Sequence, residues 1–145
     1  MGYKKIGFIG LGLIGGSIAK AIKETAPETE LYGHASHIET IREAYDAGVI
    51  KNNEMLSMSD FGGMDIIFLC CPVRANVKYL NEIKPHLSPE CLITDVGSVK
   101  GKITNEVKKL GLLSQFIGGH PMTGSEKTGF LNSSPQLLEN AYYIL

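Results

Sequence analysis

The chain has 145 residues, with 14 lysines and arginines against 15 acidic residues and a formal net charge of −1, so it has the length of one ordinary domain. Its 43% hydrophobic and 20% charged residues exclude a disordered chain, a coiled coil and a small disulfide-stapled protein. Because it lacks a basic excess, tryptophan and any apolar run near the ~20 residues that span a bilayer, we expect neither nucleic acid nor a membrane as a partner.

Strand and helix patterns alternate through the first half of the chain. Residues 4–10 predict a short apolar strand that runs at once into glycines and a helix, and residues 31–33 predict a second strand followed by a second helix. Gly48 is expected to end that second helix from the position just after its C-cap. The apolar residues at helical spacing are Ile14, Ile18 and Ile22 in the first helix and Ile38, Ile41 and Tyr45 in the second.

The second half of the chain continues the alternation. Residues 65–71 form a continuous apolar run, which predicts a strand covered on both faces, as in a parallel sheet. A helix ended by Pro85 follows, then a strand over residues 91–96 and a helix that stops at Gly111. The remaining predicted strands are residues 116–118 and 141–145.

This order of elements predicts an α/β fold of the Rossmann type, a doubly wound and mostly parallel sheet with helices on both faces. Residues 1–145 are expected to form one domain. Ligands of such sheets bind at the carboxyl ends of the strands, so the loops at that edge are the candidates for function. The strand-like run at the end has no turn or polar tail after it, which leads us to expect that the chain stops at a domain boundary.

A glycine-rich turn follows the first strand and opens the first helix. Gly10, Gly12 and Gly15 have the spacing G-x-G-x-x-G, which in a βαβ unit is typical of dinucleotide binding. Gly10 would permit the tight turn, Gly12 the approach of the pyrophosphate, and Gly15 close packing of the helix on the strand. Leu13 and Ile14 complete this predicted contact with the cofactor. The alternative is a glycine-rich turn that binds no ligand.

The second predicted strand ends without the acidic residue that reads the ribose 2′-hydroxyl of NAD. Ala35 stands at that position, and Ser36 and His37 follow it as candidate donors to a 2′-phosphate. Loss of the repelling carboxylate favours NADP slightly over NAD, although the usual arginine is also missing. His34 and His37 are about equally well explained as ordinary polar loop residues, and no third ligand accompanies them to form a metal site.

Two later loops carry the remaining candidate chemistry. Asp95, Gly97 and Ser98 follow a buried strand, where Ser98 is placed to cap the next helix or to contact a substrate. The loop over residues 118–129 carries four glycines, three hydroxyls, a carboxylate, a lysine and His120. Histidine exchanges a proton near neutral pH, and loops at this edge are often functional, so His120 is a candidate general base.

The three cysteines indicate a reducing environment. Cys70, Cys71 and Cys91 are odd in number and lie inside apolar runs, so we expect buried, reduced thiols and neither disulfides nor metal ligands. The start of the chain also lacks a signal-peptide pattern, so a cytoplasmic location is expected.

Four motifs in this order resemble the nucleotide-binding half of the prephenate dehydrogenases. They are Gly-Leu-Gly-Leu-Ile-Gly-Gly-Ser at 10–17, Cys-Pro-Val-Arg at 71–74, Asp-Val-Gly-Ser-Val-Lys at 95–100 and Gly-Gly-His-Pro-Met-Thr-Gly-Ser-Glu-Lys-Thr-Gly at 118–129. Many dehydrogenases share the glycine-rich turn, whereas the last two motifs are specific. The resemblance implies oxidative decarboxylation of prephenate to 4-hydroxyphenylpyruvate in tyrosine biosynthesis, with hydride transfer to NAD or NADP. Some members of the family prefer arogenate.

The resemblance also implies roles for single residues. His120 resembles the base that takes the proton from the ring hydroxyl of the substrate. Ser98 resembles the serine that hydrogen-bonds this histidine and the same hydroxyl, and Glu126 resembles an acid near the mouth of the site. Ser125 is expected to contact the substrate as well. The further residues expected to contact the cofactor are Cys71, Pro72, Val73, Asp95 and Gly97. Thr123 departs from the family, in which a smaller alanine is common at this position.

In this family a helical domain follows the nucleotide-binding domain. It supplies the dimer interface and the cationic side chains that bind the substrate carboxylates. Nothing in the 145 residues corresponds to it. We therefore expect the full-length protein to be a homodimer, and this chain alone to bind a dinucleotide weakly and to turn over little or no prephenate. Two other interpretations stay open: a non-catalytic dinucleotide-binding module, and another hydride-transfer enzyme such as a β-hydroxyacid dehydrogenase or an imine reductase.

Overall fold

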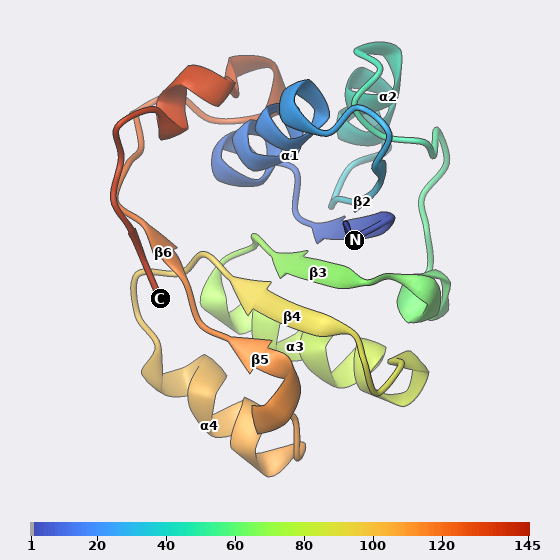
Figure 1. The fold of residues 1–145 in the computed structure, drawn as a ribbon, viewed down its shortest axis with the longest axis vertical. Helices are drawn as coiled ribbons and strands as arrows, with labels where there is room; N and C mark the ends of the chain where they lie inside the picture. The colour runs from blue at the N-terminus through green and yellow to red at the C-terminus, as the bar shows by residue number, and fades with distance from the viewer. Residues whose placement is uncertain (1) are drawn as a thin grey trace.

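A five-stranded parallel sheet forms the centre of the structure, a computed structural model that describes residues 2–145 (Figure 1). The strands lie in the order β2-β1-β3-β4-β5, and each pairs in parallel with its neighbours. Their bounds are β1 Lys5–Ile9, β2 Glu30–His34, β3 Ile66–Leu69, β4 Leu92–Asp95 and β5 Phe116–Ile117. This arrangement confirms the predicted Rossmann-type sheet, with every strand slightly shorter than its apolar run except β2.

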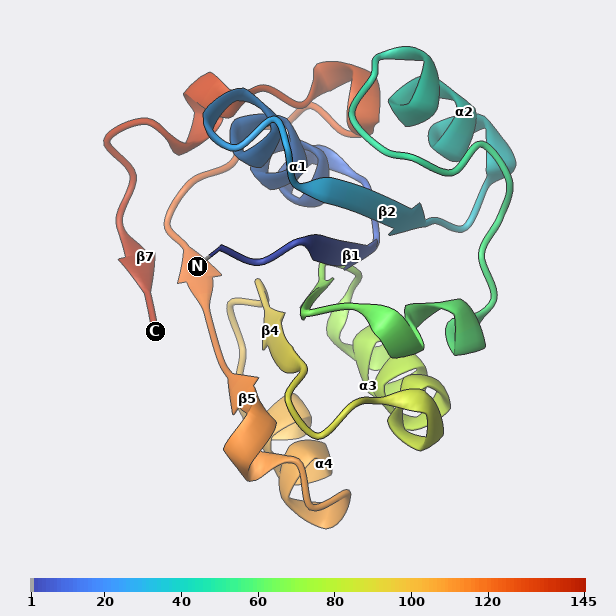
Figure 2. The same ribbon diagram turned by 45° about the vertical axis from the view of Figure 1, so that its right-hand side comes forward.

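Helices cover both faces of the sheet (Figures 1 and 2). Ile18 and Ile41, from the first two helices, belong to one buried cluster with Phe8, whereas Leu80 and Ile103, from the last two, belong to a second cluster. The four helices are α1 Leu13–Thr25, α2 Ile38–Asp46, α3 Val73–Ile83 and α4 Gly101–Lys109. Because side chains alternate along a strand, the same strands contribute to both clusters, which explains their continuous apolar sequences.

Short elements connect the main ones, and the sequence predicts one of them, the strand at the end of the chain, over residues 141–145. His120 and Pro121 form the strand β6 (His120–Pro121), which pairs in antiparallel fashion with β7 (Tyr143–Ile144). The expectation of an irregular loop at His120 is therefore wrong for these two residues, because the end of the chain returns to pair with them. The short 3₁₀ helices are Met58–Gly63, Lys84–His86, Leu113–Gln115, Phe130–Asn132 and Pro135–Leu138.

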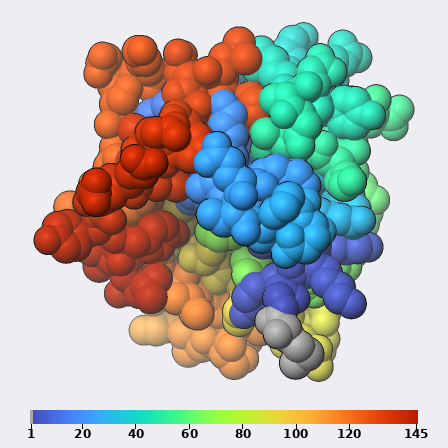
Figure 3. Space-filling view, turned by 45° about the horizontal axis from the view of Figure 1, so that its top comes forward, coloured from blue at the N-terminus to red at the C-terminus, as the bar shows by residue number. Residues whose placement is uncertain are grey.

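The segment after residue 129 packs on α1 (Figure 3), where the orange and red end of the chain lies beside the blue start. Phe130 is buried, and Lys20 Nζ donates to its carbonyl at 3.2 Å and to that of Ser133 at 2.8 Å. The amide of Ser134 donates to Ser17 Oγ at 2.9 Å. A Cβ on Gly16 would lie 2.6 Å from Ser133 Oγ, so the glycine at this position is required by packing.

Within residues 2–145, no helix has the length and apolarity needed to cross a bilayer.

Replacing Gly48 with alanine is expected to lower the free energy of unfolding by about 1 kcal/mol. Gly48 follows the C-cap of α2 with φ +72°, which confirms the predicted helix end, and its amide donates to the carbonyl of Tyr45. No atom lies within 4 Å of the added Cβ, so the cost is that of the backbone alone. Gly101→Ala is the control, because Gly101 begins α4 with an ordinary φ. Urea denaturation that finds equal stability for the two variants would contradict this reasoning.

Candidate active site

The glycine-rich turn joins β1 to α1, and its three glycines meet different surroundings. Gly10 has φ +102°, and a Cβ on Gly15 would lie 2.2 Å from the carbonyl oxygen of Gly10, so the backbone itself requires glycine at both positions. A Cβ on Gly12 would meet nothing within 4 Å, and Gly12 is exposed. The open space therefore lies at Gly12, just where α1 begins.

The N-terminus of α1 forms no hydrogen bond with a capping side chain. Its first turn contains no acidic residue. The first amides of a helix have no partner within it and carry a partial positive charge, so an anion such as a pyrophosphate is well accommodated there. A dinucleotide therefore fits the residues of this turn.

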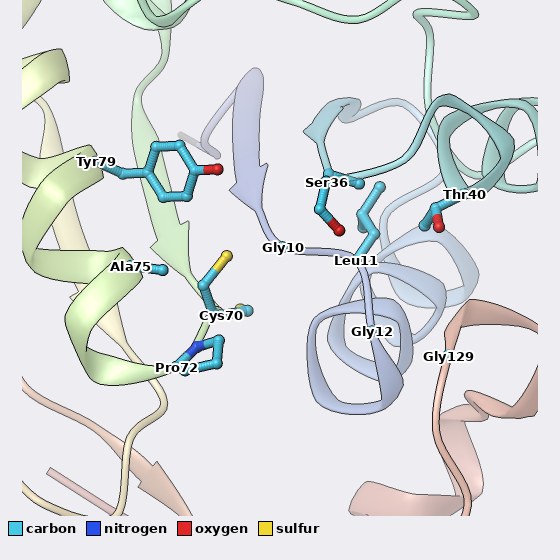
Figure 4. A pocket seen from close by; sticks show the side chains of 12 residues that line it. Gly10, Leu11, Gly12, Ser36, Thr40, Cys70, Pro72, Ala75, Tyr79 and Gly129 are labelled. Atoms are coloured by element: carbon cyan, nitrogen blue, oxygen red, sulfur yellow. The ribbon is translucent and has the colours of Figure 1, made fainter.

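A pocket of about 360 Å³ opens beside the turn (Figure 4). Tyr79 on α3 and Ser36 after β2 project toward it from opposite sides, and Gly10 lies between them in this view. Its lining residues are Gly10, Leu11, Gly12, Ala35, Ser36, Thr40, Cys70, Cys71, Pro72, Ala75, Tyr79 and Gly129. Eight of them directly follow the carboxyl ends of β1, β2 and β3, the edge at which ligands of such sheets bind, and the other four come from α2, from α3 and from the segment before Phe130.

Six of the thirteen residues predicted to contact a cofactor line this pocket, and seven do not. Those that line it are Gly10, Gly12, Ala35, Ser36, Cys71 and Pro72. Those that do not are Leu13, Ile14, Gly15, His37, Val73, Asp95 and Gly97. Sequence analysis missed Thr40 and Tyr79, which lie in two different helices outside the quoted motifs, and it did not assign Gly129, the last residue of the motif at 118–129, to the cofactor.

His34 has structural partners. Its Nδ1 lies 3.0 Å from the carbonyl oxygen of Leu56, and its ring meets that of Tyr79 edge-on at 5.2 Å. These contacts favour the interpretation of His34 as an ordinary structural residue. Among the described residues, no group of three or more histidine, cysteine or acidic side chains is placed to hold a metal ion.

The cysteines are all free thiols, although only Cys91 is fully buried. The expectation of burial is therefore wrong for Cys70 and Cys71, which are partly open to the pocket because they follow the end of β3. Burial raises the pKa of Cys71 to about 11, and its Sγ donates to the carbonyl of Ile9 at 3.4 Å. Burial also raises the pKa of Cys70. Both remain protonated at neutral pH and are poor nucleophiles.

A second pocket, of about 480 Å³, contains His120 and Ser98. His120 is half-buried on β6, and its Nδ1 lies 3.5 Å from the carbonyl oxygen of Val96. Ser98 is exposed and does not cap α4, because Lys100 occupies the N-cap position without a side-chain cap. The structure thus brings His120 and Ser98 to one pocket and excludes the capping role considered for Ser98.

Asp95 and Lys100 form an ion pair that contacts Gly119, the residue before His120. Both carboxylate oxygens of Asp95, which is almost fully buried, accept from Lys100 Nζ at 2.7 Å. Lys100 also donates to the carbonyl of Gly119, whose amide donates to Asp95 Oδ1 at 3.3 Å. The pair therefore fixes the residue that precedes His120. The role of Lys100 was missed, because its partners lie 5 and 19 positions away.

Ser125 and Glu126 lie apart from that pocket. Both are exposed, and Ser125 Oγ accepts from the amide of Lys127 at 2.9 Å. Neither lines the pocket of His120 and Ser98. The loop that carries them starts at His120 and ends at Gly129, which lines the nucleotide pocket, so one loop joins the two pockets.

Comparison with known proteins agrees with this geometry. The sequence profile described as "Prephenate dehydrogenase, nucleotide-binding domain" matches residues 18–145. The prephenate dehydrogenase of Lactococcus lactis subsp. cremoris is 42% identical over 146 residues, which cover 98% of this chain and 40% of the relative. This chain belongs to the prephenate dehydrogenase family. The match of nearly the whole chain excludes the other hydride-transfer families that the turn alone left open.

Solved members of the prephenate dehydrogenase family have the same fold. The prephenate dehydrogenase from Aquifex aeolicus, solved in complex with hydroxyphenyl propionate and NAD⁺, is 32% identical with a TM-score of 0.88, covering 99% of this chain and 50% of that one. The arogenate dehydrogenase from Synechocystis is 35% identical with a TM-score of 0.84, covering 96% and 48%. The chain thus spans about half of these structures and 40% of its curated relative.

Proposed function

We propose that this chain is the dinucleotide-binding part of an enzyme that converts prephenate to 4-hydroxyphenylpyruvate, with hydride transfer to NAD or NADP, in tyrosine biosynthesis. The observation that carries this proposal is the loop that joins the two pockets, with His120 at one end and Gly129 at the other. The relatives support it, since the Aquifex aeolicus enzyme was solved with NAD⁺ and a hydroxyphenyl compound. A sensor that only binds nucleotide has no use for His120 and Ser98 in a second pocket.

The nucleotide would lie across the glycine-rich turn, with its pyrophosphate at Gly12 and the N-terminus of α1. Bound there, it supplies the acceptor for the hydride. Ala35, Ser36 and Thr40 would surround the ribose farthest from the reacting ring. We retain the other predicted cofactor contacts as part of the proposal: Leu13, Ile14, Gly15, His37, Cys71, Pro72, Val73, Asp95 and Gly97.

His120 would act as the base. A backbone carbonyl only accepts hydrogen bonds, so the contact of Nδ1 with Val96 favours the tautomer that carries its hydrogen on Nδ1. Nε2 then has the free lone pair that takes the proton of the ring hydroxyl. Ser98, in the same pocket, would orient that hydroxyl, and Ser125 and Glu126 would approach the substrate from the exposed loop. Loss of CO₂ makes the ring aromatic, so the protein mainly binds, orients and accepts one proton.

Binding of NAD and NADP to the 145-residue chain tests the first half of this proposal. Gly12→Val is expected to weaken binding by at least about tenfold, because its side chain fills the open space at Gly12 that the pyrophosphate would occupy. Isothermal titration calorimetry measures the change, and Gly124→Ala, in an open part of the exposed loop, is the control. Equal affinity of the unaltered chain and Gly12→Val would contradict the proposed site.

The cofactor preference is proposed to lean slightly toward NADP. Ala35 is nearly buried at the end of β2, and Ser36 beside it lines the pocket. Ala35→Asp is expected to weaken NADP binding relative to NAD by about tenfold, because a carboxylate accepts from a 2′-hydroxyl and repels a 2′-phosphate. The ratio of the two dissociation constants checks this, with Ala47→Asp, exposed at the end of α2, as a control for the added charge. An unchanged ratio would remove Ala35 from the nucleotide site.

Arogenate is the second candidate substrate, because the Synechocystis relative is an arogenate dehydrogenase. We further propose that the complete protein carries a helical domain through which it forms a homodimer. This domain would also supply the cationic side chains that bind the substrate carboxylates. By itself the chain is then expected to bind dinucleotide and to turn over little prephenate. The free thiols agree with a proposed cytoplasmic location. The proposed partners are small molecules, and we propose neither nucleic acid nor a membrane as a partner.

A further inference from the structure

The strand that carries His120 has one partner, β7, and the two strands divide their side chains between two faces. His120 pairs with Ile144 and Pro121 pairs with Tyr143. Paired residues of an antiparallel ladder project to the same face. In agreement, His120 and Ile144 line the same pocket, whereas Tyr143 lines an apolar groove behind the sheet. Figure 2 shows β7 alongside the segment that leads up from β5.

The ring of Tyr143 lies against Gly119, the residue just before His120. A Cβ on Gly119 would lie 2.6 Å from Cε1 of Tyr143 and 3.0 Å from its hydroxyl oxygen. The same glycine is bound on its other sides by Asp95 and Lys100. Gly119 is therefore buried and surrounded by three side chains, and its lack of a side chain makes room for the tyrosine.

Tyr143 differs from its neighbour in the same strand region. It is 41% exposed, whereas Tyr142 is 82% exposed. Burial raises the pKa of Tyr143 to about 12, with smaller contributions from the nearby Cys70 and Asp95, so the phenol stays neutral at physiological pH. The neutral ring packs against the backbone of Gly119, and its hydroxyl also lies near Thr94.

We propose that Tyr143 is a positioning residue for His120: its ring presses on Gly119, opposite the Asp95–Lys100 pair, and so sets the direction in which β6 presents the histidine. The importance of this for turnover rests on the proposed function, in which His120 is the base. The packing itself does not depend on that function, so the two can be tested separately.

Nuclear magnetic resonance of the 145-residue chain tests the packing. In Tyr143→Ala we expect the amide hydrogens of Gly119 and Met122 to exchange at least about tenfold faster, and the imidazole signals of His120 to shift. Tyr143→Phe retains the ring and is expected to keep both readouts unchanged. Tyr142→Ala, which removes a ring that lies in solvent, is the matched control. Amides of α1 and α3 report whether the variants remain folded.

The outcomes separate the inference from the proposed function. Unchanged His120 signals in folded Tyr143→Ala, or equal changes in Tyr142→Ala, would overturn the positioning role. In a form of the protein that oxidises prephenate, Tyr143→Ala is expected to lower kcat with little change in the KM for the dinucleotide, and Tyr143→Phe to restore kcat. If His120→Asn leaves turnover intact while Tyr143→Ala still disturbs His120, the proposed function fails and the positioning role remains.

Discussion

His120→Asn is expected to lower kcat for prephenate oxidation by about 10²–10⁴-fold, the usual contribution of a general base. Asparagine is similar in size and keeps a polar group near the carbonyl of Val96, but it cannot accept the proton of the ring hydroxyl. The measurement is steady-state turnover by a form of the protein that oxidises prephenate. Binding of the dinucleotide is expected to change little, because His120 lies outside the pocket at the glycine-rich turn.

Two controls make this result specific. His86→Asn alters an exposed histidine in a 3₁₀ helix far along the chain from the loop, and it is expected to leave kcat unchanged. Ser98→Ala is expected to lower kcat by less than His120→Asn, since it removes an orienting group and leaves the base in place. Full activity of His120→Asn would show that another group takes the proton.

Lys100→Met is expected to lower the free energy of unfolding by about 3 kcal/mol. The change leaves the carboxylate of Asp95, 2% exposed, without its cation, and a buried unpaired charge costs about 3–5 kcal/mol. The lower value applies because the Lys100 side chain is 33% exposed and water reaches it. Urea denaturation monitored by circular dichroism gives the difference.

Lys109→Met is the matched control for Lys100→Met. Its side chain is 75% exposed and lies 3.8 Å from Glu106, so its loss is expected to cost at most about 0.5 kcal/mol. Asp95→Asn combined with Lys100→Met removes both charges and is expected to recover part of the loss. If the two single lysine variants were equally stable, the Asp95–Lys100 pair would contribute no more than a surface pair.

The main sheet was predictable because its central strands β1, β3 and β4 are covered on both faces and so have nearly continuous apolar sequences. Helix ends were predictable at Gly48 and Gly111, where φ is +72° and +71° and glycine is the natural residue. These signals are local, since a few neighbouring residues determine them. The same holds for the glycine-rich turn, whose backbone contacts lie within a single βαβ unit apart from Cys70.

The rest of the site depends on partners that are distant in sequence. β6 and β7 have two residues each, and although residues 141–145 predict a strand, their sequence does not indicate that its partner is the segment of His120 and Pro121. The motif at 95–100 does not indicate whether the carboxylate of Asp95 contacts a ligand or a side chain of the protein. The structure shows that it contacts Lys100. Thr40 and Tyr79 line the pocket beside the glycine-rich turn from α2 and α3. The sequences of these two helices indicate only which of their residues are buried, and neither contains a binding motif. Gly16 looks like part of the phosphate turn, yet it makes room for Ser133.

The contact between α1 and the segment after Phe130 also determines when the nucleotide pocket can be completed during synthesis. The hydrogen bond from Ser134 to Ser17 spans 117 positions, and Gly129 forms part of the pocket wall. A nascent chain emerges from its N-terminus, so the glycine-rich turn is made early but remains without that wall until the segment around Gly129 has also left the ribosome. A dinucleotide at the proposed site can therefore stabilise this domain fully only after that segment has packed on α1.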